Sequence, residues 1–234
     1  RPGEASGEAA RQPGSDEADG PRHEDKGTGS GLLSAALTRE NLQRAWKRVK
    51  ANKGSAGVDG LDIAQTAEHL RTAWPVIRDQ LLQGTYRPSP VRRLRIPKPG
   101  GGERALGIPT VTDRLIQQAL LQVLQVRIDP TFSDHSHGFR PGRRAHDAVR
   151  QARHYVQDGY RMVVDVDLEK FFDTVNQSKL IEVISRTVKD GRVVSLIHKY
   201  LNAGVVVRNR FEETNMGVPQ GGPLSPLLSN IMLN

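Results

Sequence analysis

The sequence predicts an α+β fold in which amphipathic helices accompany a β-hairpin, one apolar strand and a second strand pair. Apolar residues recur every three or four positions over several long stretches, which is typical of helices with one buried face. Residues 91–97 and 161–168 instead alternate in character from one position to the next, which is typical of strands. Glycine and proline clusters separate these stretches and mark the loops between them.

The length and composition bound the kind of protein. The 234 residues are 36% hydrophobic and 26% charged, which allows one sizeable core or two subdomains that share a cleft. No apolar run approaches the roughly 18 residues that a membrane-spanning helix needs, so we expect no membrane partner. The chain has 0 cysteines, which excludes disulfides and thiolate metal sites and suits a cytoplasmic protein.

The charge is distributed unevenly along the chain. Residues 1–30 carry four basic and seven acidic residues and almost no large apolar residue, which predicts a disordered tail and linker reaching residue 37. The net charge is −3 for residues 1–30 and +8 for the whole chain, so residues 31–234 carry +11. A folded region this basic favours a polyanionic partner, and with 5% aromatic residues, base stacking is not its dominant contact.

The first half of the chain is predicted to consist of helices, one hairpin and shaped loops. A helix follows Thr38, because apolar residues from Leu42 onward keep helical spacing. The glycine-rich segment 52–60 forms a loop, and a second helix covers about 63–82. Residues 86–109 form a hairpin, with Leu94 and Ile96 on one face and Arg93 and Arg95 on the other.

The second half is predicted from the same signals. A helix begins near Thr112 and ends at Pro130, a basic loop covers 131–144, and another helix covers 145–158. Residues 161–168 have the strongest strand pattern in the chain. The remaining elements are helices at about 177–188 and 190–202, a strand pair within 204–218, and a helix beginning near Pro223.

Acidic residues at the end of the predicted strand are candidates for metal binding. Asp165 and Asp167 lie at i and i+2 and therefore project from the same face. Carboxylates in this position suit Mg²⁺ binding, because Mg²⁺ prefers oxygen ligands. The alternative interpretation is that these side chains are solvated acids at the end of a strand. A metal nuclease that uses Asp165, Asp167 and Asp173 is a further possibility, but the sequence supplies no evident base to activate water.

Two glycine-rich segments are candidates for substrate contacts. Lys98 and Arg104 flank the glycine turn of the hairpin and can point at one anion such as a triphosphate, or form a solvated tip. Gln220 lies in the segment 217–226, where it can bond a substrate hydroxyl or base edge, or belong to an ordinary loop. The segment 138–144 is either a phosphate-binding turn or a basic loop. The histidines do not have the spacing of zinc ligands, so they do not predict a zinc site.

Taken in order, these motifs resemble those of bacterial group II intron-encoded reverse transcriptases/maturases over about residues 38–234. The match depends on six ordered blocks, which makes it specific. The blocks are Asn52-Lys53-Gly54 with Gly57-Val58-Asp59-Gly60, Ile96-Pro97-Lys98 through Arg104 with Leu106-Gly107-Ile108-Pro109, Asp113-Arg114 with Gln117-Gln118, Gly138-Phe139-Arg140-Pro141-Gly142, Asp167 with Phe171-Phe172-Asp173, and Pro219-Gln220-Gly221 with Ser225-Pro226-Leu227-Leu228-Ser229-Asn230.

The resemblance implies the fingers and partial palm of a right-hand polymerase, truncated before the second catalytic motif. The implied domains are an N-terminal extension at 38–85, fingers at 86–150 and a partial palm at 151–234. The loop 52–60 is similar to the family's template-covering extension. Ala105 stands where a proline is usual in the family, which would loosen the hairpin slightly.

The resemblance also implies roles for individual residues. Asp167 would be the catalytic carboxylate and a Mg²⁺ ligand, with the Leu168 carbonyl beside it. Phe172 would form the floor under the nucleotide sugar and exclude a ribose 2′-hydroxyl. Lys98 and Arg104 would bind the dNTP triphosphate, and Gln220 would hold the nucleotide at the primer end. We further expect RNA contacts from the basic residues Lys53, Arg92, Arg93, Arg95 and Arg140.

The function that the resemblance implies is RNA-directed DNA synthesis with a maturase role in splicing and intron mobility. The expected partners are group II intron RNA, template RNA, primer DNA and dNTPs. The family's Tyr-Ala-Asp-Asp block is absent, so we expect an inactive piece of an active protein. The alternative function is an intron RNA-binding splicing factor without polymerase activity.

Overall fold

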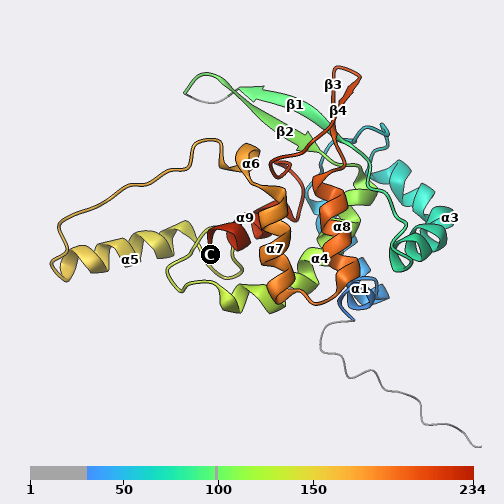
Figure 1. The fold of residues 1–234 in the computed structure, drawn as a ribbon. Helices are drawn as coiled ribbons and strands as arrows, with labels where there is room; N and C mark the ends of the chain where they lie inside the picture. The colour runs from blue at the N-terminus through green and yellow to red at the C-terminus, as the bar shows by residue number, and fades with distance from the viewer. Residues whose placement is uncertain (1–30, 98–99) are drawn as a thin grey trace, which may run out of the picture.

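The computed structural model describes residues 31–97 and 100–234, and it confirms the predicted α+β class (Figure 1). One four-stranded sheet has the order β2-β1-β3-β4. The strands are β1 (Val91–Pro97), β2 (Glu103–Ile108), β3 (Val205–Val207) and β4 (Arg210–Glu212). The α-helices are α1 (Leu32–Ala36), α2 (Arg39–Ala51), α3 (Ile63–Leu82), α4 (Val111–Ile128), α5 (Ala145–Gln157), α6 (Phe171–Thr174), α7 (Gln177–Thr187), α8 (Gly191–Leu201) and α9 (Ser225–Leu233), and a 3₁₀ turn, η1 (Asp129–Thr131), follows α4.

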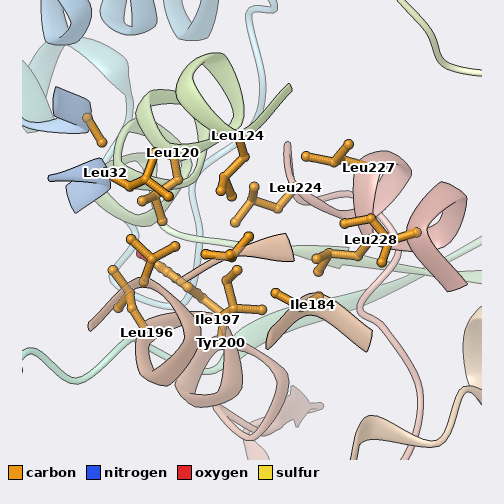
Figure 2. Packing of buried hydrophobic residues seen from close by; sticks show 14 of the residues in the cluster. Leu32, Leu120, Leu124, Ile184, Leu196, Ile197, Tyr200, Leu224, Leu227 and Leu228 are labelled. Atoms are coloured by element: carbon orange, nitrogen blue, oxygen red, sulfur yellow. The ribbon is translucent and has the colours of Figure 1, made fainter. Parts of the chain in front are cut away.

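Helix α4 lies at the centre of the main hydrophobic core. Its Ile116, Leu120 and Leu124 are almost completely buried, and they belong to one cluster with apolar residues of α1, α7, α8 and α9. Figure 2 shows Leu120 and Leu124 of α4 among Leu196, Ile197 and Leu224 of the surrounding segments. Burial of this apolar surface is the main force that holds the helices together.

Side-chain caps explain why several helices begin where the sequence predicts. The hydroxyls of Thr38 and Thr110 accept hydrogen bonds from the backbone N–H of Asn41 and Asp113 at the starts of α2 and α4. Asp62 starts α3 with a complete capping box that includes Gln65. Each cap satisfies a backbone donor that the first turn leaves free, so these boundaries follow from local sequence.

Residues 31–37 correct one prediction. They do not continue the predicted tail and linker, because residues 32–36 form α1. Leu33 of this helix is 0% exposed, and its backbone N–H donates to Asp190 Oδ2 at 3.1 Å. A five-residue helix is unstable alone, but here its apolar face completes the core beside α4 and α8.

The predicted hairpin and the second strand pair are both present. β1 and β2 pair antiparallel with Ile96 opposite Arg104, and β3 and β4 pair antiparallel with Val207 opposite Arg210. β1 also pairs parallel with β3 through Val91 and Val205, which joins the two hairpins into one sheet. In Figure 1 this sheet projects from one end of the helical body.

The predicted strand at 161–168 is wrong for this structure. Residues 161–168 form no β-strand, and Met162, Val164 and Val166 are 91%, 85% and 77% exposed. A strand requires a neighbour that pairs with its backbone groups, and the four strands of the described chain pair with one another instead. The segment therefore runs extended between α5 and α6, away from the helical body (Figure 1).

A buried polar cluster joins three parts of the fold around Asp113 of α4. The Asp113 carboxylate accepts hydrogen bonds from the hydroxyls of Tyr86, at 2.8 Å, and Tyr200, at 3.2 Å. It also accepts from the Ser89 backbone N–H, at 3.2 Å, and from the Thr110 hydroxyl, at 2.7 Å. The carboxylate thereby connects the segment before β1, the start of α4 and helix α8.

Candidate nucleotide and nucleic-acid site

Two adjoining pockets lie where the hairpin meets the helical body. The larger, of about 770 Å³, is lined by residues 52–55, residues 106–109 of β2 and its following turn, Arg114 and Gln118 of α4, and the segment 220–226. The smaller, of about 320 Å³, lies between the sheet and the segment 214–220. Phe172 and Gln220 line both pockets.

A glycine-containing strap, residues 217–226, crosses strand β2 at the boundary of the pockets. The Gly107 N–H donates to the Gln220 carbonyl at 2.6 Å, which fixes the strap to the strand. Gly221 has φ +120°, and a Cβ there would lie 2.4 Å from the Gly107 carbonyl oxygen. Only glycine allows this close approach, which explains why a glycine occupies position 221.

Phe172 is held in the site by the same strap. The Val218 N–H donates to the Phe172 carbonyl at 2.7 Å, and the Phe172 ring packs edge-on against Phe171 with centroids 5.6 Å apart. The two adjoining pockets together are called the hollow, and the structure brings Phe172, Gln220 and the backbone of β2 around it. These segments are far apart in the sequence.

Asp167 lies outside that hollow. It belongs to the exposed segment 161–168, its Oδ1 accepts the Leu168 N–H at 3.0 Å, and it lines neither pocket. Within the described residues, no three His, Asp or Glu side chains converge in a way that could hold a metal ion, and this includes Asp165, Asp167 and Asp173. As arranged here, the described residues do not fit a complete Mg²⁺ site.

The hairpin tip is only partly described. Lys98 lies outside the described residues, and Arg104 is a residue of β2 whose backbone pairs with Ile96. Ala105, the next residue of β2, lines the smaller pocket together with Phe172. The end of β2 that leads to the hairpin tip therefore borders the hollow.

Four of the predicted RNA-contacting residues are placed on or beside the hairpin. Lys53 lines the larger pocket. Arg92 donates to the Ala56 carbonyl at 2.8 and 3.2 Å, so it holds the loop 52–60 against the sheet. Arg93 and Arg95 form exposed ion pairs with Glu212 and Glu103. Such pairs are weak, which leaves both arginines able to exchange partners.

Arg140 is not an RNA-facing residue in this structure. Its side chain is 4% exposed and forms an ion pair with Asp129 at 3.0 Å. It also donates to the backbone carbonyls of Ser133, Ser136 and Asp129 at 2.6, 3.1 and 2.9 Å. The prediction of an RNA contact fails because the loop 131–144 folds around the guanidinium and satisfies its donors internally.

Replacement of Arg140 by glutamine is expected to lower the midpoint of thermal unfolding and to leave the RNA affinity of the folded protein unchanged. The substitution leaves Asp129 and two loop carbonyls without their donors. Circular dichroism melts and RNA-binding titrations measure the two effects. Arg143→Gln, which removes a more exposed arginine of the same loop, is the control and should reduce stability less. A loss of RNA affinity without a loss of stability would instead indicate that Arg140 contacts RNA.

Sequence reasoning assigned no role to two pocket residues, Arg114 and Gln118. Both belong to a block that supported the family resemblance, and the helical periodicity places them beside the apolar face of α4. Their types and spacing were visible in the sequence. Their position against the loop 52–55 depends on how α4 packs against a segment about 60 residues away.

Comparison with known proteins identifies the family. Residues 96–234 match the family model described as reverse transcriptase (RNA-dependent DNA polymerase). The match covers more than half of the chain, so the chain belongs to the reverse transcriptase family. The predicted fold class, that of reverse transcriptase fingers with part of the palm, is thereby confirmed.

The chain is similar to group II intron-encoded proteins in particular. It is 39% identical over 191 residues to the group II intron-encoded protein LtrA of Lactococcus lactis subsp. cremoris, which covers 81% of this chain and 32% of the relative. It is 38% identical over 209 residues to Protein YkfC of Escherichia coli (strain K12), which covers 87% and 55%. The chain thus spans about half or less of the length of these relatives.

A solved structure supports the fold. The structure titled "Partial Cas6-RT-Cas1--Cas2 complex" matches with a TM-score of 0.58 and 24% identity, over 86% of this chain and 34% of that chain. The likeness shows a shared fold. Separately, none of the helices in the described residues has the length and apolarity needed to cross a membrane.

Proposed function

We propose that this chain provides the nucleotide-binding part of an RNA-directed DNA polymerase encoded by a group II intron. The observation that carries the proposal is the convergence of Phe172, Gln220 and the backbone of β2 on one hollow. Nucleotide addition is a phosphoryl transfer, in which catalysis depends mainly on positioning and on charge stabilisation. The Phe172 ring offers a surface that positions an incoming dNTP, and the basic hairpin beside it offers charges that stabilise the phosphates.

The residues of the hollow have distinct roles in the proposal. Phe172 forms the floor under the nucleotide sugar, where its ring leaves no room for a 2′-hydroxyl and so selects dNTPs. Gln220 holds the nucleotide at the primer end. Lys98 and Arg104 bind the triphosphate, because a guanidinium fork and an ammonium together neutralise its oxygens.

Asp167 and the Leu168 carbonyl are the proposed Mg²⁺ ligands. Reverse transcriptases use divalent metal ions, and Mg²⁺ prefers such oxygen ligands. Because the described residues do not converge into a complete metal site, further carboxylates must complete it. The segment 158–170 must also bring Asp167 toward the hollow.

The proposed partners are template RNA, primer DNA, dNTPs and group II intron RNA. The charge of +11 on residues 31–234 supports a polyanionic partner. The same charge, together with the similarity to the protein named "Nuclear intron maturase 1, mitochondrial" of Arabidopsis thaliana, favours a second candidate function. That candidate is an intron RNA-binding splicing factor that synthesises no DNA.

Primer extension on poly(rA)/oligo(dT) tests the proposal. We expect the whole product of the gene that encodes this chain to synthesise DNA in the presence of Mg²⁺, and the 234-residue chain alone to be inactive. Absence of synthesis by the whole product, with RNA binding retained, would reject the polymerase and favour the splicing factor. Clear synthesis by the 234 residues alone would refute the expectation that the described site is incomplete.

A further inference from the structure

An arm, residues 145–168, presents apolar surface that no other described part of the chain covers. The chain runs out along α5 and returns through the extended segment 161–168 (Figure 1). Among the described residues α5 has no buried side chain, and its Val149 and Val156 are 67% and 62% exposed. Apolar residues gathered in this way mark an interaction surface, so the arm requires a partner.

The apolar residues of α5 form one stripe along the helix. They recur at intervals of three and four positions, and they are Ala145, Ala148, Val149, Ala152, Tyr155 and Val156. His154 lies on the opposite face, where its side chain is 64% exposed. A helix with a single apolar stripe normally packs that stripe against another element, and here Val149 and Val156 are still open to solvent.

The segment 161–168 also has two distinct faces. The apolar side chains of Met162, Val164 and Val166 alternate with the residues of the other face, which carries Arg161 at one end and Asp167 at the other. Since the segment forms no strand with the described chain, its backbone groups are available to pair with a strand of another molecule.

The segment is complementary to a second copy of itself. In an antiparallel pair centred on Val164, each Val164 lies opposite the other and Met162 lies opposite Val166, so one face of the ribbon is wholly apolar. On the other face Arg161 of each copy lies opposite Asp167 of the second copy, which gives two ion pairs. A shift of one residue places charged side chains opposite apolar ones and loses both features.

The two α5 helices can supply the remaining contacts of such a pair. A two-stranded ribbon alone is marginally stable in water, but a helix packed against its apolar face stabilises it. Residues 158–160 connect α5 to the segment, so the apolar stripe of each helix can cover the apolar face of the ribbon. The charged face of the ribbon then stays in water.

We propose that this chain forms a twofold homodimer through the arm, with the segments 161–167 paired antiparallel about Val164 and covered on one face by both α5 helices. The inference goes beyond the proposed function and does not depend on it. A second copy is the occupant because each segment carries both members of the Arg161–Asp167 pair. The same surface of both molecules is then used, as in a closed twofold interface.

Cysteine cross-linking tests the register directly, because the chain has 0 cysteines. In the proposed register, cysteines introduced by Val164→Cys have Cα atoms about 4.5–5.5 Å apart, which is within disulfide range. Val166→Cys is the matched control on the same face, and its two cysteines would lie roughly 13 Å apart along the ribbon. We expect disulfide dimers to form at least about tenfold faster with Val164→Cys. Equal rates, or faster cross-linking of Val166→Cys, overturn the register.

Charge reversal tests the ion pairs by sedimentation equilibrium of the full chain, freed of nucleic acid. Arg161→Glu places two carboxylates opposite each other in both pairs, so we expect the dimer dissociation constant to rise about tenfold. Adding Asp167→Arg restores opposite charges and should return the constant to within about threefold of the wild-type value. The control Arg208→Glu makes the same charge change in the exposed turn between β3 and β4 and should have no effect. Failure of the double variant to recover overturns the pairing.

A third comparison tests the role of α5. Val149→Lys places a charge in the apolar stripe and should weaken the dimer about tenfold, whereas His154→Lys on the opposite face should not. Both side chains are mostly exposed, so circular dichroism melts should show unchanged folding of each variant. Equal effects of the two variants overturn the role of the stripe. A wild-type chain that stays monomeric at every protein concentration overturns the dimer and leaves the arm to a different partner.

Discussion

Replacement of Asp167 by alanine in the whole gene product is expected to reduce DNA synthesis by at least about 10³-fold, because metal-assisted charge stabilisation contributes several kcal/mol to such reactions. The RNA affinity should remain nearly unchanged, since Asp167 carries no positive charge and is exposed in the structure. Primer extension rates and RNA-binding titrations measure the two effects in the same preparations.

Asp165→Ala is the matched control for that experiment. Asp165 lies two residues before Asp167 in the same exposed segment. We expect a much smaller loss of synthesis from Asp165→Ala, because the family resemblance assigns metal binding to Asp167. Equal losses from both variants would contradict that assignment, and full activity of Asp167→Ala would reject the catalytic role.

Replacement of Asp113 by alanine is expected to reduce the free energy of unfolding by about 3–5 kcal/mol. The substitution removes the common acceptor of the Tyr86 and Tyr200 hydroxyls and leaves both buried. Burial, followed by the charge of Asp113, raises the pKa of Tyr86 and of Tyr200, so these hydroxyls stay protonated and continue to need an acceptor. Urea unfolding curves at neutral pH measure the change.

Two controls test the explanation of that loss. Asp113→Asn keeps one carbonyl acceptor and removes the buried charge, so we expect a smaller loss than from alanine. Burial raises the pKa of Asp113 because it disfavours the charged carboxylate, so loss of the charge itself should cost little stability. Glu68→Ala, at an exposed position of α3, should have almost no effect. Similar losses from Asp113→Ala and Glu68→Ala would contradict the proposed role of the cluster.

Local sequence determined most of the secondary structure of this protein. Thr38, Asp62 and Thr110 accept backbone hydrogen bonds at helix starts, and the glycine turn after Pro97 reverses the chain into β2. These features depend on interactions within a few residues, so periodicity and capping predict them. The order of the motif blocks likewise predicted the reverse transcriptase family.

The tertiary structure alone decided which residues have partners. Residues 161–168 have the alternating pattern of a strand but lack a neighbouring strand to pair with. Arg140 lies in a basic, glycine-containing segment that is typical of a phosphate-binding loop, but its side chain is enclosed by that loop. Conversely, the sequence does not show that Arg114 Nε and Gln118 Nε2 lack hydrogen-bond partners. This depends on how α4 packs near the loop 52–55. Strand pairing, burial and the hydrogen bonding of polar groups depend on segments that are distant in the sequence. The local sequence pattern does not indicate which of these distant segments lies next to a given residue in the fold.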